Sequence, residues 1–357
     1  MKRPYEDTIE RSRDRRQFLK TVSAGAMGLV LGTAAGSVES HASTASPGES
    51  SVSFVTGTDR RDMMHRVLEP LKGEIRLGIA GKQVVLKCNL VGPDALSAVH
   101  VDAVRGVLDF LKPMYSKVII IGDSTGRTYP GPVSTWKHFE IHKYLPLPAE
   151  YKVKLVDFND LGTRRLWVVD KGLHPSAINI IDIFLDPKNY IISLAQLKTH
   201  SNVVATLSVK NMAMGSPINH YRVGNSEKNL MHAGSFKNLN FNIFTIAQHV
   251  RPALSIIDGL VGMEGNGPTQ GTAVEHGIAL AGTDMIAVDR IGTQLMGIKF
   301  EDIGYLTYCA QADMGQSNPA RIRIIGPDPA QYVKRYKLHQ DFERQMIWKE
   351  GLVIDPK

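Results

Sequence analysis

The sequence predicts an α/β fold in which a mostly parallel sheet is flanked by helices. Strand-like and helix-like segments alternate along most of the chain, as they do in layered α/β proteins. Residues 117–121 are almost entirely apolar, which is typical of a strand that is buried in a parallel sheet, and a Gly/Ser-rich turn follows them at once. We expect two interlocked α/β halves with an irregular insertion.

The first half contains short strands and amphipathic helices in alternation. Residues 51–56 and 83–87 favour strands. Residues 60–71 and 101–111 place their apolar side chains at helical spacing, so each is expected to pack one face on a sheet.

The middle, residues 129–186, is less regular and contains several prolines, so we interpret it as an insertion or cap over the sheet edge. Within it we expect a helix near 136–144 and strands near 153–158, 165–169 and 179–184. In the second half we expect strands at 190–194, 253–258, 278–281 and 321–325, and helices at 203–212, 236–249, 284–296 and 330–348.

The N-terminus resembles a twin-arginine export signal. Arg15-Arg16 is followed by an uncharged small and apolar stretch over residues 21–38, and Ser40-His41-Ala42 supplies small residues for cleavage. The alternatives are a chance arginine pair and an anchor that is never cut. The stretch is short and Gly-rich beside the ~20 apolar residues of a membrane span. We therefore expect no permanent span, and export of the folded protein by the Tat machinery to the periplasm.

These features divide the chain into a signal peptide (1–42), a linker (43–52), an α/β domain (53–328) containing the insertion (129–186), and a C-terminal helix (329–357). The chain carries a net charge of +7. Seven Lys/Arg and five Asp/Glu fall in the first 42 residues, so the remainder carries +5. No basic block interleaves with aromatic residues. This pattern disfavours nucleic acid as a partner and suits a small anionic ligand.

The cysteine count excludes one class of cofactor. An iron–sulfur cluster needs about four thiolates, and the chain has only Cys88 and Cys309. These two residues either form one disulfide in an oxidising compartment or remain as buried thiols; the sequence leaves both alternatives open.

Polar residues follow several predicted strands at their carboxyl ends, where open α/β sheets bind ligands. The positions are Lys87, Asn89, Asp123, Ser124, Lys198, Thr199, His200, Asp258, Glu264 and Asp284. For the acidic residues and Asn89, the alternative is that they are ordinary turn formers. A lysine that ends an apolar strand is harder to explain in that way, because a buried ammonium needs an anionic partner.

The same positions carry a resemblance to the domain-of-unknown-function 362 family, over residues 53–306. The matching motifs are Val85-Leu86-Lys87-Cys88-Asn89-Leu90, Ile121-Gly122-Asp123-Ser124, Leu197-Lys198-Thr199-His200, Val209-Lys210-Asn211, Met231-His232, Ile257-Asp258-Gly259, Glu264-Gly265-Asn266-Gly267-Pro268 and Ala281-Gly282-Thr283-Asp284. The resemblance implies little chemistry, because no activity is assigned to the family. The chain departs from the family by having Cys88 where proline is usual, and by lacking the cysteine-rich segment that binds four-iron clusters in many members.

His200 and His232 are the candidate metal ligands or acid–base groups. With Asp258 or Glu264 they would form a two-histidine, carboxylate site for a divalent metal such as Zn, Fe or Mn. The alternative for each histidine is a hydrogen-bonded core residue.

Lys198 and Lys210 bracket the helix predicted at 203–212 and could bind phosphate or carboxylate at its start, together with Lys87, Asn89, Asp123, Ser124 and Asn211. Lys210-Asn211 could instead cap the end of that helix. Gly265 and Gly267 belong to a Gly/Pro loop whose backbone could approach a ligand closely, although a tight connection explains it as well.

Two functions follow from these observations. The first is an exported metal- or cofactor-dependent enzyme that acts on a small anionic substrate, with His200, Lys198 and His232 as the catalytic candidates. The alternative is a non-catalytic ligand-binding protein or a maturation partner of periplasmic iron–sulfur enzymes.

Overall fold

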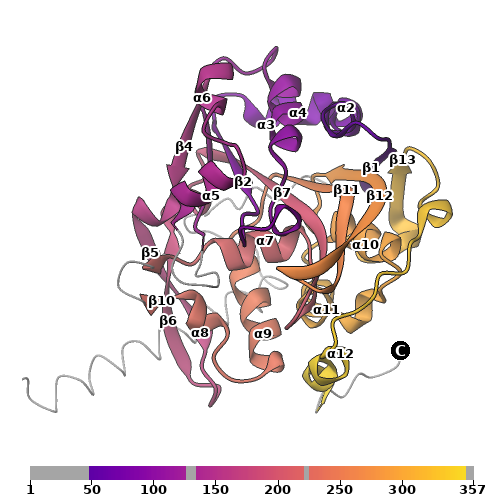
Figure 1. Cartoon of the computed structure of the whole chain (residues 1–357). Helices are drawn as coiled ribbons and strands as arrows, with labels where there is room; N and C mark the ends of the chain where they lie inside the picture. Colours follow the sequence, from indigo (N-terminus) through magenta and orange to yellow (C-terminus); the bar gives the residue numbers. More distant parts are fainter. Residues whose placement is uncertain (1–47, 126–133, 221–224, 351–357) are drawn as a thin grey trace, which may run out of the picture.

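A nine-stranded mixed sheet forms the centre of the protein (Figure 1). The computed structural model describes residues 48–125, 134–220 and 225–350. The predicted export signal, with Arg15 and Arg16, lies outside them. Across the sheet the strands are β13 (Ile322–Ile325), β1 (Ser50–Thr56), β12 (Gln270–Gly282), β11 (Leu254–Asn266), β7 (Asn189–His200), β2 (Gln83–Cys88), β3 (Ile119–Asp123) and β4 (Val153–Asp157). β8 (Val204–Thr206) pairs with the end of β7.

The sheet is mostly parallel, which confirms the predicted fold class. β11, β7, β2, β3 and β4 pair in parallel with one another, and so do β1 and β13. Only β12, which pairs with β1 and β11, and the short β8 are antiparallel. Because the parallel strands share one direction, their carboxyl ends meet at one edge of the sheet.

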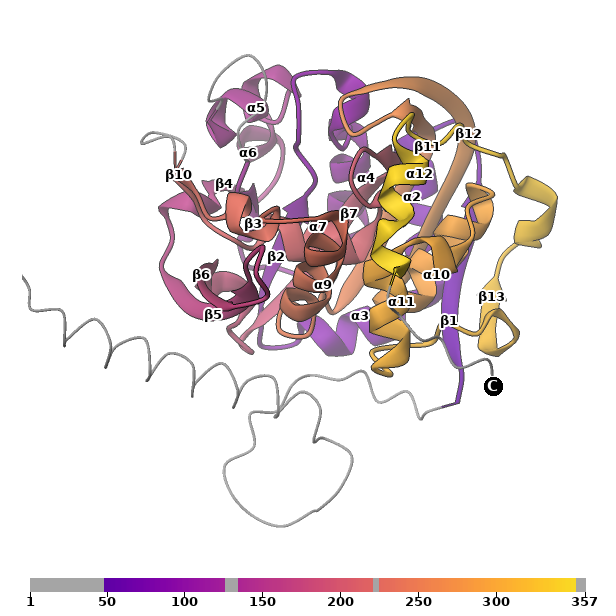
Figure 2. The same cartoon turned by 90° about the horizontal axis from the view of Figure 1, so that it is seen from below.

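Helices cover both faces of this sheet (Figure 1; Figure 2). Apolar residues of α2 (Arg60–Leu68), α3 (Lys72–Ile79) and α4 (Val101–Leu111) share one hydrophobic cluster with Leu86. Those of α7 (Ser208–Gly215), α9 (Phe236–Ala247), α10 (Met285–Leu295) and α11 (Gly304–Gln311) share the other cluster with Val85. Successive side chains of β2 thus pack into hydrophobic clusters on opposite faces of the sheet, because side chains alternate along a strand.

The predicted insertion extends the sheet as well as covering it. β4 is the edge strand beside β3, while β5 (Thr163–Val169) and β6 (Pro175–Ile181) form a separate antiparallel pair. α5 (Thr135–Ile141) and α6 (Leu147–Glu150) precede β4. β9 (Asn219–His220) and β10 (Asn225–Ser226) form a second small pair, which α8 (Lys228–Met231) follows.

Two predicted helices are wrong. Residues 203–212 contain β8 and then the start of α7, so Lys210 lies in the first turn of a helix and cannot cap its end. In the described part of the predicted C-terminal helix, only α12 (Phe342–Gln345) is α-helical, between the 3-10 turns Pro329–Tyr332 and Met346–Lys349. Backbone groups between these turns bond to other elements: Lys334 N donates to Leu295 O, and Tyr336 N to Met296 O. Backbone hydrogen bonds to distant residues thus replace the bonds that a continuous helix would form within itself.

The Gly/Pro loop is also shorter than expected, because β11 and β12 form a long hairpin whose ladder continues to Asn266 and Gln270. Among the described residues, no helix has both the length and the apolar character needed to cross a membrane.

Candidate functional site

Lys87 forms a buried ion pair at the carboxyl end of β2. Its Nζ lies 2.8 Å from Asp123 Oδ1 on the neighbouring strand β3, and both side chains are at most 5% exposed. The same amine donates to Asn211 Oδ1 of α7 at 2.8 Å and to Cys88 O at 2.6 Å. These three acceptors take all three N–H groups of the ammonium, so Lys87 connects β2, β3 and α7.

The neighbouring predicted ligands also bond to one another. Asp123 accepts from the backbone N–H groups of Leu90 (2.8 Å) and Ser124 (2.7 Å), and Asn89 Nδ2 donates to Asn211 Oδ1 at 3.2 Å. Ser124 Oγ donates to Gly215 O at 2.6 Å. A Cβ on Gly215 would lie 2.2 Å from Lys87 Cε, so the end of α7 can approach this network only because residue 215 is glycine.

Three further lysines lie near this ion pair. Lys198 is fully buried and donates to Ser97 O at 2.7 Å. Lys228 of α8, which the sequence analysis missed, donates to Ser124 O. Lys210 of α7 is 8% exposed and makes no hydrogen bond or ion pair with another described residue. Lys228 precedes His232 by four residues, and that helical spacing is the signal that could have revealed it.

Burial and mutual repulsion lower the pKa values of these amines. The pKa of Lys210 falls to about 7, mainly through burial and further through the charges of Lys228 and Lys87. Burial brings the pKa of Lys228 to about 8, although Asp123 opposes the change. The pKa of Lys198 lies well below its usual range because of burial and then of Lys210. Near neutral pH the site therefore contains unprotonated amine.

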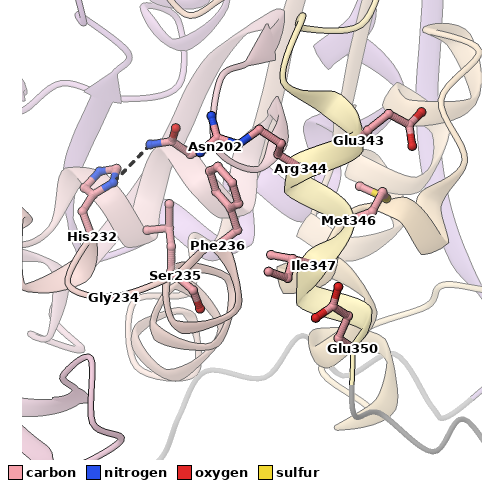
Figure 3. A pocket seen from close by; sticks show the side chains of 11 residues that line it. Asn202, His232, Gly234, Ser235, Phe236, Glu343, Arg344, Met346, Ile347 and Glu350 are labelled. Carbon is pink, nitrogen blue, oxygen red and sulfur yellow. Dashed lines mark hydrogen bonds between the residues drawn. The ribbon is translucent and has the colours of Figure 1, made fainter.

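The two predicted histidines meet through Asn202. His200 Nδ1 accepts from Asn202 N at 3.0 Å, and Asn202 Nδ2 lies 3.3 Å from His232 Nδ1 (Figure 3). Burial, followed by the charge of Lys210, holds the pKa of His200 well below its usual range and brings that of His232 to about 4. Both rings are thus neutral near pH 7. We call Lys198, Lys210, Lys228, His200 and His232 the lysine–histidine cluster.

The carboxylates predicted to join these histidines are engaged elsewhere. Asp258 lies 2.8 Å from Arg60 Nε of α2 and accepts from Leu260 N at 3.1 Å. Glu264 accepts from Lys337 N at 2.8 Å. Within residues 48–125, 134–220 and 225–350, no three or more His, Cys, Asp or Glu side chains are grouped so that they could hold a metal ion. A metal at His200 and His232 stays a prediction.

The first two N–H groups of α7 are already bound by a side chain of the protein. Asp289 of α10 is fully buried and accepts from Ser208 N at 2.8 Å and from Val209 N at 2.9 Å. The anion site expected at this helix start is therefore occupied by a side chain of the protein itself. Asp289 binds only backbone groups, so the side-chain amine of Lys210 can still bind an anion at the lysine–histidine cluster.

Gly265 and Gly267 have packing roles. Gly267 lies against β7, where an added Cβ would lie 2.2 Å from Thr199 O, and Gly265 N donates to Lys337 O at 2.7 Å. The end of the β11–β12 hairpin therefore covers the end of β7, which carries Lys198 and His200.

A cavity of about 710 Å³ adjoins the cluster at His232 (Figure 3). Asn202 and His232 form one wall, and Phe236 and Leu239 of α9 contribute apolar surface. The opposite wall comes from the C-terminal segment, with Glu343, Arg344, Met346, Ile347 and Glu350. The cavity therefore offers both apolar and charged contacts next to a neutral imidazole.

The two cysteines are free and buried. Cys88 belongs to the cluster of α2, α3 and α4, and Cys309 to the cluster on the other face of the sheet. Of the two alternatives, the structure has the buried thiols. Burial raises the pKa of Cys88 to about 12, so its thiol stays protonated near neutral pH.

Comparison with known proteins identifies the family. The family model described as Domain of unknown function (DUF362) matches residues 84–294, which is more than half of the chain. The chain belongs to this family. The matched range contains the whole lysine–histidine cluster and the Lys87–Asp123 ion pair, whereas the C-terminal wall of the cavity lies beyond it.

Among the relatives of this DUF362 protein is a thylakoid-associated protein of Synechocystis sp., with 28% identity over 270 residues that cover 74% of this chain and 77% of the relative. A crystal structure of a Thermotoga maritima protein matches with a TM-score of 0.36 and 12% identity, over 72% of this chain. The match spans only 60% of the Thermotoga maritima chain.

Proposed function

We propose that this protein is an enzyme that binds a small anionic substrate at the lysine–histidine cluster. The supporting observation is Lys210, a buried amine without a partner among the described residues, which is surrounded by other basic groups. The neighbouring carboxylate, Asp123, is already paired with Lys87. An anion would supply the missing counter-charge and would favour protonation of the lysines around it.

The same charges argue for an anion in preference to a metal cation. Lys228, whose pKa of about 8 keeps it mostly protonated near pH 7, would repel a divalent ion at the two histidines, and Asp258 and Glu264 already bind Arg60 and the Lys337 backbone. The cavity beside His232 has the size of small-molecule sites, which are about 300–1,000 Å³, and would hold the rest of the substrate.

Sulfate tests the anion site because its charge does not change near neutral pH. We expect titration calorimetry to detect sulfate binding that weakens at least about tenfold in Lys210→Met, since one charge-assisted hydrogen bond is worth about 1.5–3 kcal/mol. Binding should strengthen as the pH falls through about 7, where Lys210 takes up its proton. Lys72→Met, on exposed α3, is the control and should bind as the unaltered protein does.

Equal binding by the Lys210 and Lys72 variants would contradict the anion site. Removal of metal ions with a chelator, verified by elemental analysis, separates the metal alternative. Sulfate binding should persist in metal-free protein. Its loss, with recovery when Zn²⁺ is added, would instead support a metal at His200 and His232.

We further propose that the enzyme works outside the cytoplasm after Tat export, on the strength of Arg15-Arg16 and the uncharged stretch that follows. Replacing the pair (Arg15→Lys with Arg16→Lys) should leave the protein in the cytoplasm, because the export machinery reads the arginines and not their charge alone. Cell fractionation with immunodetection measures this, and Arg3→Lys is the control. Equal amounts of both variants in the periplasm would contradict Tat export.

A further inference from the structure

Lys210 differs from the other lysines at the site in having no interaction that requires an amine. Lys87 binds Asp123, Lys198 donates to Ser97 O, and Lys228 donates to Ser124 O. Lys210 has no such acceptor among the described residues, although it is only 8% exposed. An amine that has no acceptor among the described residues, on a residue with so little exposure, calls for an explanation other than packing.

Two chemical properties of the surroundings define what this amine can do. Burial and then the charges of Lys228 and Lys87 lower its pKa to about 7, so a large fraction of the amine is unprotonated and nucleophilic near neutral pH. The same cations attract an anionic group placed next to it. A primary amine reacts reversibly with aldehydes and ketones, so the reacting partner should combine a carbonyl group with a negative charge.

We propose that Lys210 forms a Schiff base with a small oxo acid, a carboxylate that carries an aldehyde or ketone. This inference rests on the proposed function, because the lysine–histidine cluster must first bind the acid as an anion. The carboxylate would lie against Lys228 and Lys198, which orients the carbonyl carbon toward Lys210 Nζ.

The reaction balances without any further reactant. The lone pair of Lys210 Nζ adds to the carbonyl carbon, and the carbonyl oxygen takes up a proton. Loss of that oxygen as water, with both hydrogens of the original amine, leaves a carbon–nitrogen double bond. When the imine nitrogen is protonated, it withdraws electrons from the imine carbon and favours proton loss from the carbon bonded to it.

Borohydride trapping tests the proposal. The full-length protein is incubated with glyoxylate, pyruvate or 2-oxoglutarate near pH 7 and reduced with borohydride, and the adducts are located by peptide mass spectrometry. We expect the Lys210 peptide to be labelled at least about tenfold more than any exposed lysine, because a lysine with an ordinary pKa near 10.4 is almost entirely protonated at that pH. Mapping in the unaltered protein needs no variant, so a folding defect cannot obscure the result.

Lys210→Arg separates covalent chemistry from binding, since guanidinium keeps the charge but forms no imine. It should lose the adduct and retain sulfate binding within a few-fold, whereas Lys72→Arg should keep both. Sulfate binding with no adduct at Lys210 for any of the three acids would overturn the Schiff base and leave the anion site standing. Absence of both adduct and sulfate binding would overturn the proposed function as well.

Discussion

Replacing Lys87 by alanine is expected to lower the free energy of unfolding by about 3–5 kcal/mol, because it leaves the Asp123 carboxylate buried without its cation. Asn211 Oδ1 and Cys88 O lose their donor at the same time. The loss should therefore be among the largest for any single substitution in this protein. Urea unfolding followed by circular dichroism measures it.

A matched exposed pair provides the control. Lys72 and Glu69 form an ion pair in which both side chains are more than 40% exposed, so Lys72→Ala should cost less than about 1 kcal/mol. The double variant Lys87→Met with Asp123→Asn removes both charges and should recover part of the loss, since no unpaired charge then remains buried. Similar small losses for Lys87→Ala and Lys72→Ala would show that the buried pair does not stabilise the fold.

Replacing Lys210 by methionine is expected to stabilise the protein near and below neutral pH. Folding lowers the pKa of Lys210 from 10.5 to about 7, so the unfolded chain binds this proton more tightly than the folded protein does. The contribution of Lys210 to the free energy of unfolding therefore rises as the pH increases from about 7 to about 10. Below about pH 7 the buried charge lowers the free energy of unfolding by a constant amount. One pKa unit corresponds to about 1.4 kcal/mol, so the full effect is on the order of 5 kcal/mol.

Unfolding of the unaltered protein and the variant at several pH values measures this linkage. The unaltered protein should gain stability relative to Lys210→Met between about pH 7 and 10. The basic groups that face Lys210 are Lys87, Lys198, Lys228, His200 and His232; both proteins retain them, so most of their titration cancels in the comparison. A difference that does not change with pH would mean that Lys210 titrates normally.

The parts of the fold that the sequence predicts well are those in which local pattern and tertiary packing agree. The predicted helix at 101–111 coincides with α4 because its apolar stripe is continuous and becomes buried on the sheet. The strand predicted at 83–87 differs from β2 by one residue. The strand predicted at 117–121 overlaps β3, which begins two residues later and lies between two parallel strands.

The two predicted helices fail because their backbone groups form other hydrogen bonds, with a neighbouring strand in one case and with a distant segment in the other. Residues 204–206 lie within the predicted helix at 203–212 but pair with the end of β7, and the stretch after Tyr332 bonds to residues 295 and 296. The partner of β8 lies within a local window, and the β-branched Val203, Val204 and Thr206 were a signal for a strand. The partners of the stretch after Tyr332 lie about 40 residues upstream, outside any local window. The start of α7 fails as an anion site for the same reason, since Asp289 lies about 80 residues away.

The sequence by itself determined which residues follow the strands at their carboxyl ends, and its two cysteines predict that the chain holds no iron–sulfur cluster. Only the tertiary structure decided which of those residues already have hydrogen-bond or ion-pair partners within the protein. Lys87 and Lys210 look alike in the sequence, yet Lys87 reaches Asp123 and Asn211 across three elements while Lys210 reaches no acceptor among the described residues. The reason is physical: a buried charge is stable or reactive according to its partners, and those partners come from segments that only folding brings together.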